Sequence, residues 1–176
     1  MKGAKTLKGF PPVAKPNARV LILGSMPGVE SLNQGRYYAH AQNRFWPIMG
    51  ELVGALPSLP YPQRLQRLTS AGIALWDVLD TCESPGSLDS AIRDHSAQAN
   101  DFNAFLSSHR RIRTVLFNGA KAEGSFQRLV LPTLGEFELD YRRLPSTSPA
   151  NASQNHAFKL AAWREALFAA GAASTT

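Results

Sequence analysis

Short apolar runs alternate along the chain with segments of helical periodicity. The runs at 19–23, 73–79 and 113–117 predict buried strands, and the apolar–polar alternation at 137–143 predicts a fourth strand at or near a sheet edge. Strands that alternate with helices favour a mainly parallel sheet covered by helices on both faces. The pattern therefore predicts an α/β protein.

Helices are expected where apolar residues recur every three or four positions. In the last helix, Phe158, Ala161, Ala162, Ala166 and Leu167 would share the buried side. Capping residues, glycines and prolines limit each helix. The expected helices lie at about 44–53, 63–71, 102–106, 120–129 and 155–170.

The domain organisation is expected to be simple. A chain of 176 residues suits one α/β unit, which we place at 19–170. Residues 1–18 carry four lysines and three prolines and predict an extended arm that wraps the domain. Residues 171–176 are expected to form a flexible tail.

Polar loops follow the predicted strands, at 24–43, 77–90, 118–119 and 144–151. The first loop opens with the glycine-rich turn GSMPG and continues through polar and aromatic residues. Because the carboxyl ends of parallel strands meet at one edge of the sheet, where ligands usually bind, these loops should meet there. We expect the functional site at this edge.

Charge and composition narrow the class of partner. The net charge is +6, and 13 of the 19 basic residues are arginine, whose planar fork suits phosphate. No apolar run approaches the roughly 20 residues of a membrane span, and the basic N-terminus lacks the apolar core of a signal peptide. The single cysteine, Cys82, fits a reducing cytosol. We expect a cytoplasmic protein with a polyanionic partner and no membrane contact.

The sequence motifs of several common classes of enzyme are absent. The sequence has no GxxxxGK[ST] loop, no GxGxxG fingerprint and no GxSxG elbow, and its four histidines and one cysteine show no metal-ligand spacing. What remains at the predicted edge is a set of amides, aromatics and hydroxyls near arginines. Aromatics and amides suit a flat heterocyclic base, whereas arginines and a Ser/Thr/Pro/Asn loop suit phosphates and the minor groove.

Five segments carry a resemblance to a known family: GSMPG, YYAHAQNRFW, LWDVLDTCESPGSLDSAI, FNG and LPSTSPAN. In this order they resemble the uracil-DNA glycosylase superfamily, and most closely its DNA-deoxyinosine (hypoxanthine-DNA) glycosylase branch. The resemblance covers about residues 20–163. It implies a three-layer α/β/α sandwich around a four-stranded, mainly parallel sheet, and it makes 19–170 the glycosylase domain.

The resemblance also implies a reaction. A damaged nucleotide flips out of DNA, the N-glycosidic bond breaks through an oxocarbenium-like sugar, and water captures the sugar to leave an abasic site. Several branches carry Asp or Asn where this chain has Met26, which cannot orient water. The deoxyinosine branch assigns that duty to Asn43, which would position water rather than remove its proton. The alternative role of Asn43 is to cap the helix that follows it, and both roles can coexist. Asp77 is the runner-up as water activator.

The remaining site residues divide into two groups. Those expected to bind the flipped base are Gly24, Ser25, Met26, Pro27, Tyr38, Phe45 and Asn118, with Tyr38 and Phe45 competing for the stacking role. Those expected to bind DNA are Arg36, Arg44, Ser146, Thr147, Ser148, Pro149, Ala150 and Asn151. Further candidates for phosphate or anion contact are Arg142, Arg143, His40 and His156.

The expected enzyme is a monofunctional, monomeric glycosylase that acts on double- or single-stranded DNA carrying deoxyinosine or deoxyuridine. It should need no cofactor and no metal. A uracil or thymine mismatch glycosylase is the first alternative. A catalytically silent module that binds lesion DNA is the second, and a small-molecule hydrolase that uses Asp77 is the third.

Overall fold

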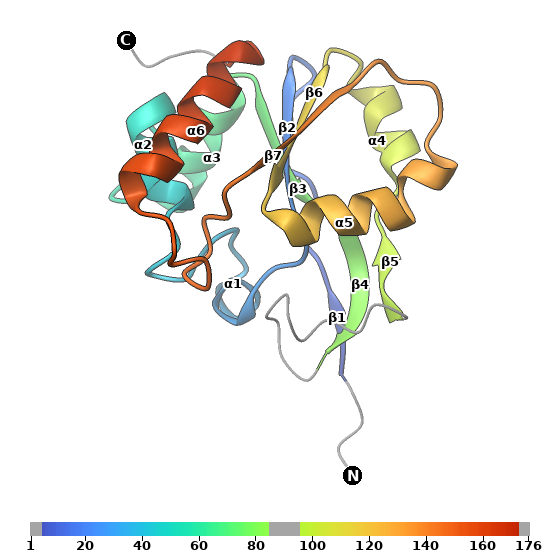
Figure 1. The fold of residues 1–176 in the computed structure, drawn as a ribbon, viewed down its shortest axis with the longest axis horizontal. Coiled ribbons are helices and arrows are strands. Elements are labelled where there is room, and N and C mark those ends of the chain that lie inside the picture. The colour runs from blue at the N-terminus through green and yellow to red at the C-terminus, as the bar shows by residue number, and fades with distance from the viewer. Residues whose placement is uncertain (1–4, 85–95, 173–176) are drawn as a thin grey trace.

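The computed structural model describes residues 5–84 and 96–172, and its centre is a four-stranded parallel sheet (Figure 1). The strand order is β3 (Ile73–Asp77), β2 (Val20–Gly24), β6 (Thr114–Asn118) and β7 (Asp140–Leu144). The first three strands are almost continuously buried, as expected for a parallel sheet covered on both faces. The more exposed β7 lies at the sheet edge, as the sequence predicts.

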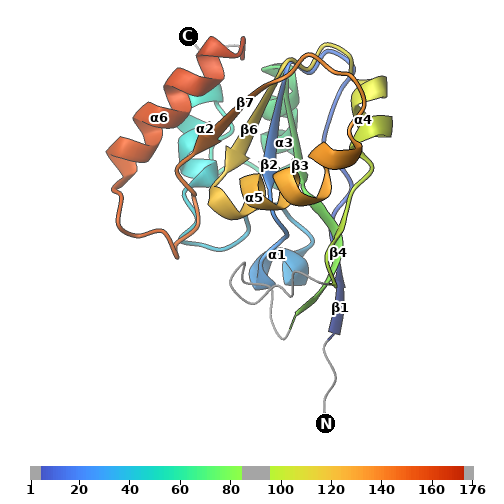
Figure 2. The same cartoon turned by 45° about the vertical axis from the view of Figure 1, so that its right-hand side comes forward.

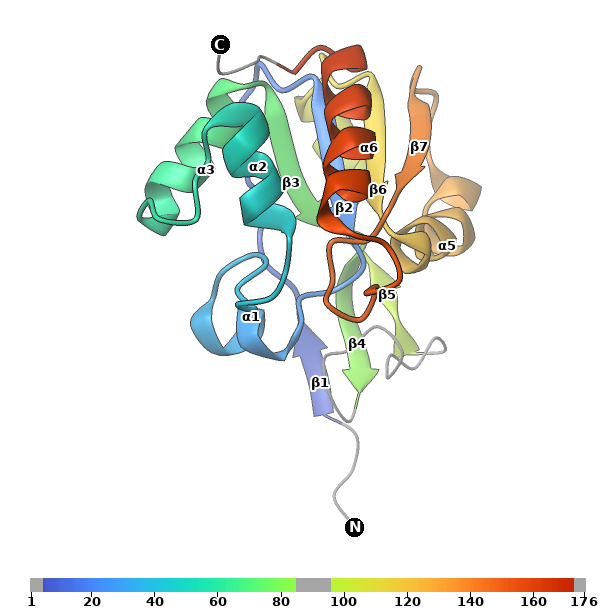
Figure 3. The ribbon, with the colours of Figure 1, turned by 60° about the vertical axis from the view of Figure 1, so that its left-hand side comes forward.

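Helices cover both faces of this sheet (Figures 2 and 3). Alternate side chains of β2 point to opposite faces, so Val20 and Ile22 join one core and Leu21 and Leu23 the other. The first core is closed by α2 (Phe45–Val53), α3 (Tyr61–Ser70) and α6 (His156–Ala169), and the second by α4 (Phe102–Ser108) and α5 (Ala120–Leu129). This arrangement confirms the three-layer α/β/α sandwich.

A second, antiparallel sheet lies below the first and was not predicted. It consists of β1 (Lys5–Lys8), β4 (Leu79–Ser84) and β5 (Gln98–Ala99), with β4 in the middle. The expected loop at 77–90 therefore contains a strand at Leu79–Ser84, and its residues 85–90 lie outside the described residues. Residues 1–4 of the expected arm and 173–176 of the expected tail also lie outside them.

Two short helices complete the described structure: α1 (Val29–Gln34) and a 3₁₀ turn at Leu131–Thr133. The first lies inside the segment that we expected to be a loop. The buried side of α6 also differs from expectation. It carries Lys159 and Trp163 beside Ala166 and Leu167, whereas Phe158 is 53% exposed.

The connections of the two central strands create a crevice. The chain leaves β2 towards α2 on one face, whereas it leaves the neighbouring β6 directly into α5 on the other face. In parallel α/β sheets such a point, where neighbouring strands send their chains to opposite faces, leaves space for a ligand. It lies at the carboxyl ends of the strands, near α1 and the segment that precedes α6 (Figure 1).

Candidate active site

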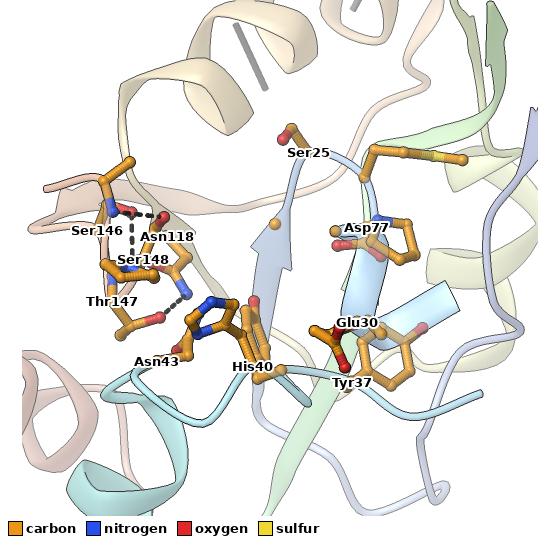
Figure 4. Close-up of a pocket in the computed structure, with 18 of the residues that line it drawn as sticks. Ser25, Glu30, Tyr37, His40, Asn43, Asp77, Asn118, Ser146, Thr147 and Ser148 are labelled. Carbon is orange, nitrogen blue, oxygen red and sulfur yellow. Dashed lines mark hydrogen bonds between the residues drawn. The ribbon is translucent and has the colours of Figure 1, made fainter. Parts of the chain in front are cut away.

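A cavity of about 580 Å³ occupies this crevice (Figure 4). Its wall combines the turn after β2 and the start of α1, the loop before α2, the ends of β3 and β6, and the loop between β7 and α6. Most of the predicted site residues lie together on it. These are Gly24, Ser25, Met26, Pro27, Tyr38, His40, Asn43, Asp77, Asn118 and the six residues Ser146, Thr147, Ser148, Pro149, Ala150 and Asn151.

Asn118 is fixed at one side of the cavity by Thr147. Its Nδ2 donates to Thr147 Oγ1, and the Thr147 N–H donates back to Asn118 Oδ1, both over 2.9 Å. A backbone N–H can only donate, so the orientation of the amide group is determined by its partner. Both amide atoms retain further hydrogen-bonding capacity, because Nδ2 has a second hydrogen and Oδ1 a second lone pair. Asn118 therefore presents a rigid amide edge to the cavity.

Asn43 lies near Asn118 and Thr147 in Figure 4. Its Oδ1 accepts a hydrogen bond of 2.9 Å from the N–H of Phe45, the first residue of α2. Arg44 is the N-cap residue of α2, so Asn43 precedes the cap position that the sequence suggested for it, but its side chain still satisfies the unpaired N–H of the first helical residue, and this bond fixes its direction. Its Oδ1 keeps one lone pair, so the structural role leaves room for contact with water.

Tyr38 and Phe45 have different positions relative to the cavity. The two rings stack at 4.1 Å with an interplanar angle of 27°, but Phe45 is fully buried and only Tyr38 lines the cavity. The expectation that Phe45 stacks on the base does not fit this geometry, because Tyr38 covers its ring. Tyr38 also has a φ of +55°, uncommon for a residue other than glycine.

Asp77 occupies the side of the cavity opposite Asn43 and Asn118 (Figure 4). It ends β3 and is 4% exposed. A Cβ atom on Gly24 would lie 2.5 Å from Asp77 Oδ1 and 3.1 Å from the Tyr38 hydroxyl. A side chain at position 24 would therefore displace the Asp77 carboxylate, so glycine fits this position best.

The loop from Ser146 to Asn151 is held by bonds within itself and by one buried cation. Ser146 Oγ accepts from the N–H of Ser148, and Ser148 Oγ accepts from the N–H of Ala150. Lys159, only 3% exposed, donates from Nζ to the carbonyl oxygen of Asn151 over 2.7 Å. Burial, followed by the charge of Arg44, lowers the pKa of Lys159.

The predicted phosphate-binding arginines do not line the cavity. Arg36 lies over the ring of Tyr61 at 5.4 Å, and Arg44 is exposed at the start of α2. Arg142 and Arg143 form ion pairs on the molecular surface with Glu165 and Glu123, respectively. His156 also lies away from the cavity lining, where its Nε2 is 3.8 Å from Glu51 Oε2.

Sequence reasoning missed the contribution of α1 and of Tyr37. Residues 28–31 line the cavity beside Tyr37, which is 4% exposed. The Tyr37 hydroxyl donates to the carbonyl oxygen of Pro11 over 2.8 Å, and burial, followed by Asp77, raises the pKa of Tyr37. The double tyrosine in YYAHAQNRFW was the available signal, but local sequence does not show which ring faces the ligand.

The cavity wall is mainly apolar, amide and hydroxyl in character. Asp77 and Glu30 are the carboxylates on it, and no lysine or arginine is part of it. Within residues 5–84 and 96–172, no three His, Cys, Asp or Glu side chains are grouped so that they could hold a metal ion. In the same residues, no helix has the length and apolarity needed to cross a membrane. A cavity with convergent amide and hydroxyl groups, at the carboxyl ends of the parallel strands of an α/β/α sandwich, has the layout of a ligand-binding site.

Comparison with known proteins identifies the family. The family model described as "Uracil DNA glycosylase superfamily" matches residues 11–169, so the chain belongs to the uracil DNA glycosylase superfamily. It is therefore an enzyme of the DNA glycosylase class, a hydrolase of N-glycosyl bonds.

Individual relatives agree with this membership. Two proteins named hypoxanthine DNA glycosylase, from Methanosarcina barkeri and Methanosarcina acetivorans, are each 37% identical over 145 residues, or 82% of this chain and 87% of the relative. A solution NMR structure from Methanosarcina acetivorans, described as a candidate uracil DNA glycosylase, superimposes with a TM-score of 0.75 at 32% identity. The match covers 94% of this chain and 99% of that one.

Proposed function

We propose that this DNA glycosylase removes hypoxanthine from deoxyinosine and that Asn43 positions the attacking water. The observation that carries the proposal is the place of Asn43, on the cavity wall with its side chain fixed by the Phe45 N–H. The two relatives named hypoxanthine DNA glycosylase support this choice of base.

The proposed chemistry matches what an amide can do. Breaking the N-glycosidic bond produces an oxocarbenium-like sugar, which needs little nucleophilic push, so a water held in line is sufficient. Asn43 Oδ1 can accept a hydrogen bond from that water through its second lone pair. Asn43 thus supplies orientation, and no covalent enzyme intermediate is needed.

Recognition of the flipped base is assigned to the ring of Tyr38 and the amide of Asn118. Tyr38 is supported from behind by Phe45 and lines the cavity, so a flat base can stack against it. Hypoxanthine presents both N–H donors and acceptor atoms at its edges, and Asn118 has a free hydrogen and a free lone pair in fixed directions. The pair of contacts suits a neutral heterocycle.

Uracil is the second candidate base. It is a smaller ring that, like hypoxanthine, carries an N–H group beside a carbonyl, so the same stacking surface and amide could bind it. The observation that favours it is the match to the structure described as a candidate uracil DNA glycosylase. The relative rates on the two bases decide between them.

The loop from Ser146 to Asn151 is proposed to hold the DNA strand around the lesion. Its hydroxyl and backbone groups lie on the cavity wall, and Lys159 holds its end in place. Replacing Ser148, Pro149 and Asn151 together should weaken lesion-duplex affinity and reduce the fluorescence rise of 2-aminopurine placed beside the lesion. Unchanged affinity and fluorescence would remove the loop from this role.

The experiment that tests the function is single-turnover cleavage of end-labelled duplexes carrying deoxyinosine, uracil, xanthine or mismatched thymine. EDTA is present, and alkali follows the reaction. Strand breaks that need alkali, fastest with deoxyinosine, are expected from a monofunctional enzyme that works without metal. If cleavage is fastest at uracil or thymine, that base is the preferred substrate and the assignment of hypoxanthine is wrong. Salt-sensitive DNA binding without breaks on any duplex would indicate a silent binding module.

A further inference from the structure

A second cavity, of about 460 Å³, lies at the opposite edge of the parallel sheet. Four arginines line it, Arg19 before β2 and Arg110, Arg111 and Arg113 before β6, together with residues 169–171 at the end of α6. Figure 1 shows this edge, with the carboxyl end of α6 beside the starts of β2 and β6, on the far side of the sheet from α1.

The positive charge of this cavity is only partly compensated. Arg113 forms an ion pair of 2.7 Å with Glu138, whereas Arg19, Arg110 and Arg111 have no ion pair with any acidic side chain of the described residues. The end of α6 contributes about half a negative charge. Four guanidinium groups therefore leave a clear positive excess in a chain whose catalytic cavity has no lysine or arginine on its wall.

The backbone around the arginines is fixed. The Arg19 N–H donates to the carbonyl oxygen of Gly72 over 2.8 Å, and the Arg113 N–H donates to the carbonyl oxygen of Arg19 over 3.0 Å. A Cβ atom on Gly171, whose φ is +92°, would lie 3.7 Å from Arg19 Cδ, so the stem of Arg19 passes close to this glycine. The strand starts thus set the spacing of two of the four charges.

The separation of the two cavities determines which partner fits. Arg19 immediately precedes the five residues of β2, and Gly24 at its end lines the catalytic cavity. Five residues of extended strand span roughly 17 Å, with the sheet and its helices between the sites. A straight duplex seated over the catalytic cavity cannot reach the opposite edge of the sheet.

The geometry points to a second nucleic-acid site, in which these arginines bind the phosphodiester backbone of another DNA segment. A guanidinium group can bind two phosphate oxygens at once. An open surface that carries several guanidinium groups suits a polyanion better than a single small anion. The enzyme would then hold one segment at the catalytic cavity while it contacts a second, which favours transfer between neighbouring DNA segments.

The test measures capture of a second duplex by the full-length protein. Enzyme is first bound to an undamaged duplex that is immobilised, and a labelled undamaged duplex is then added to measure its capture. Sedimentation of the same components in solution shows whether one protein molecule binds both duplexes. The test variant is Arg110→Gln with Arg111→Gln. The control, Arg128→Gln with Arg164→Gln, removes the same charge from exposed positions outside both cavities.

Wild type and control should capture the second duplex, and the affinity of the test variant for it should be lower by about tenfold or more. The slope of log affinity against log salt concentration should fall by the equivalent of about two phosphate contacts. The single-turnover excision rate of the test variant should equal that of wild type. Binding of one duplex only, capture only through protein dimers, or equal capture by the test variant would overturn the proposal. Competition by pyrophosphate or nucleotides at concentrations far below those needed to displace the first duplex would assign the arginines to a free phosphate ligand instead. Because undamaged DNA is used, the result does not depend on which base the enzyme removes.

Discussion

Replacing Asn43 by alanine separates its structural role from its proposed catalytic role. The substitution removes the hydrogen bond of 2.9 Å to the Phe45 N–H and, with it, the acceptor proposed to hold water. Loss of such a hydrogen bond costs about 1 kcal/mol of stability. A domain of ordinary stability, about 5 kcal/mol or more, would remain more than about 99% folded after that loss. Unfolding therefore cannot account for a large fall in rate.

The expected fall in the single-turnover rate is about 100-fold or more, equivalent to about 2.7 kcal/mol in the activation barrier. Affinity for the lesion duplex should change little, because water positioning acts in the transition state. Asn43→Asp keeps an acceptor for the Phe45 N–H and places a negative charge at the helix start, so its stability should match or exceed that of wild type. Its rate should lie above that of Asn43→Ala.

The assay uses enzyme in excess over an end-labelled deoxyinosine duplex, with urea unfolding of each variant measured in parallel. The control is Asp101→Ala, which also removes one side-chain hydrogen bond at a helix start: Asp101 is the N-cap of α4, and its Oδ1 accepts from the Ala104 N–H over 3.0 Å. It should lose similar stability and no activity. Wild-type activity in Asn43→Ala, or an equal loss of rate in Asp101→Ala, would refute the assignment of water to Asn43.

Three further changes test the wall of the cavity. Gly24→Ala places a Cβ atom against Asp77 and should lower the free energy of unfolding by about 1–3 kcal/mol. The control, Gly124→Ala, adds a Cβ atom in open space within α5 and should stabilise the protein slightly. Urea unfolding of both variants measures the difference. Lys159→Met should weaken lesion-duplex affinity, measured by fluorescence anisotropy, because it removes the hydrogen bond to the loop at 146–151, which is proposed to hold the DNA strand. The pKa of Lys159 is lower in the folded protein than its ordinary value of 10.5, so between these two pH values the folded protein binds fewer protons than the unfolded chain. The free energy of unfolding of wild type should therefore rise relative to that of Lys159→Met as pH rises through this range. If the difference between the two proteins does not change with pH, the ammonium group is not buried in its charged form. Asp77→Asn should lower the single-turnover rate less than Asn43→Ala, and a larger fall would make Asp77 the water activator.

Three strands of the central sheet could be predicted because each is a short, continuous apolar run in the sequence. Residues 20–24, 73–77 and 114–118 are buried on both faces, and such strands stand out from the helices between them. The second sheet could not be found in this way. Lys5–Lys8 and Leu79–Ser84 are largely polar, and they pair across more than seventy residues of sequence.

The buried side of α6 shows a different limit of sequence reasoning. Apolar residues of this helix are spread around all of its sides, so their periodicity alone could not show which face packs against the sheet. Two polar groups decide it, because Trp163 Nε1 donates to the carbonyl oxygen of Pro145 and Lys159 Nζ donates to that of Asn151. These partners come from the preceding loop, and their positions exist only after folding.

The arrangement of the site was predictable only at the level of loops. The ends of parallel strands must meet at one edge, so the loops after β2, β3, β6 and β7 were expected to converge. Which side chain of each loop turns inward depends on packing. Phe45 and Tyr38 are both aromatic, but Phe45 begins α2 and points into the core, which leaves Tyr38 at the cavity.

Thr147 joins three parts of the molecule at one fully buried residue. It exchanges two hydrogen bonds with Asn118, and its carbonyl oxygen accepts from the N–H of Arg44, the neighbour of Asn43. Substitutions at Thr147 and Asn118 should therefore be strongly non-additive, because either one breaks the same pair of bonds. Sequence change at this junction is then constrained as a unit: a change in the loop at 146–151 that moves Thr147 also moves the Asn118 amide and the start of α2, next to Asn43.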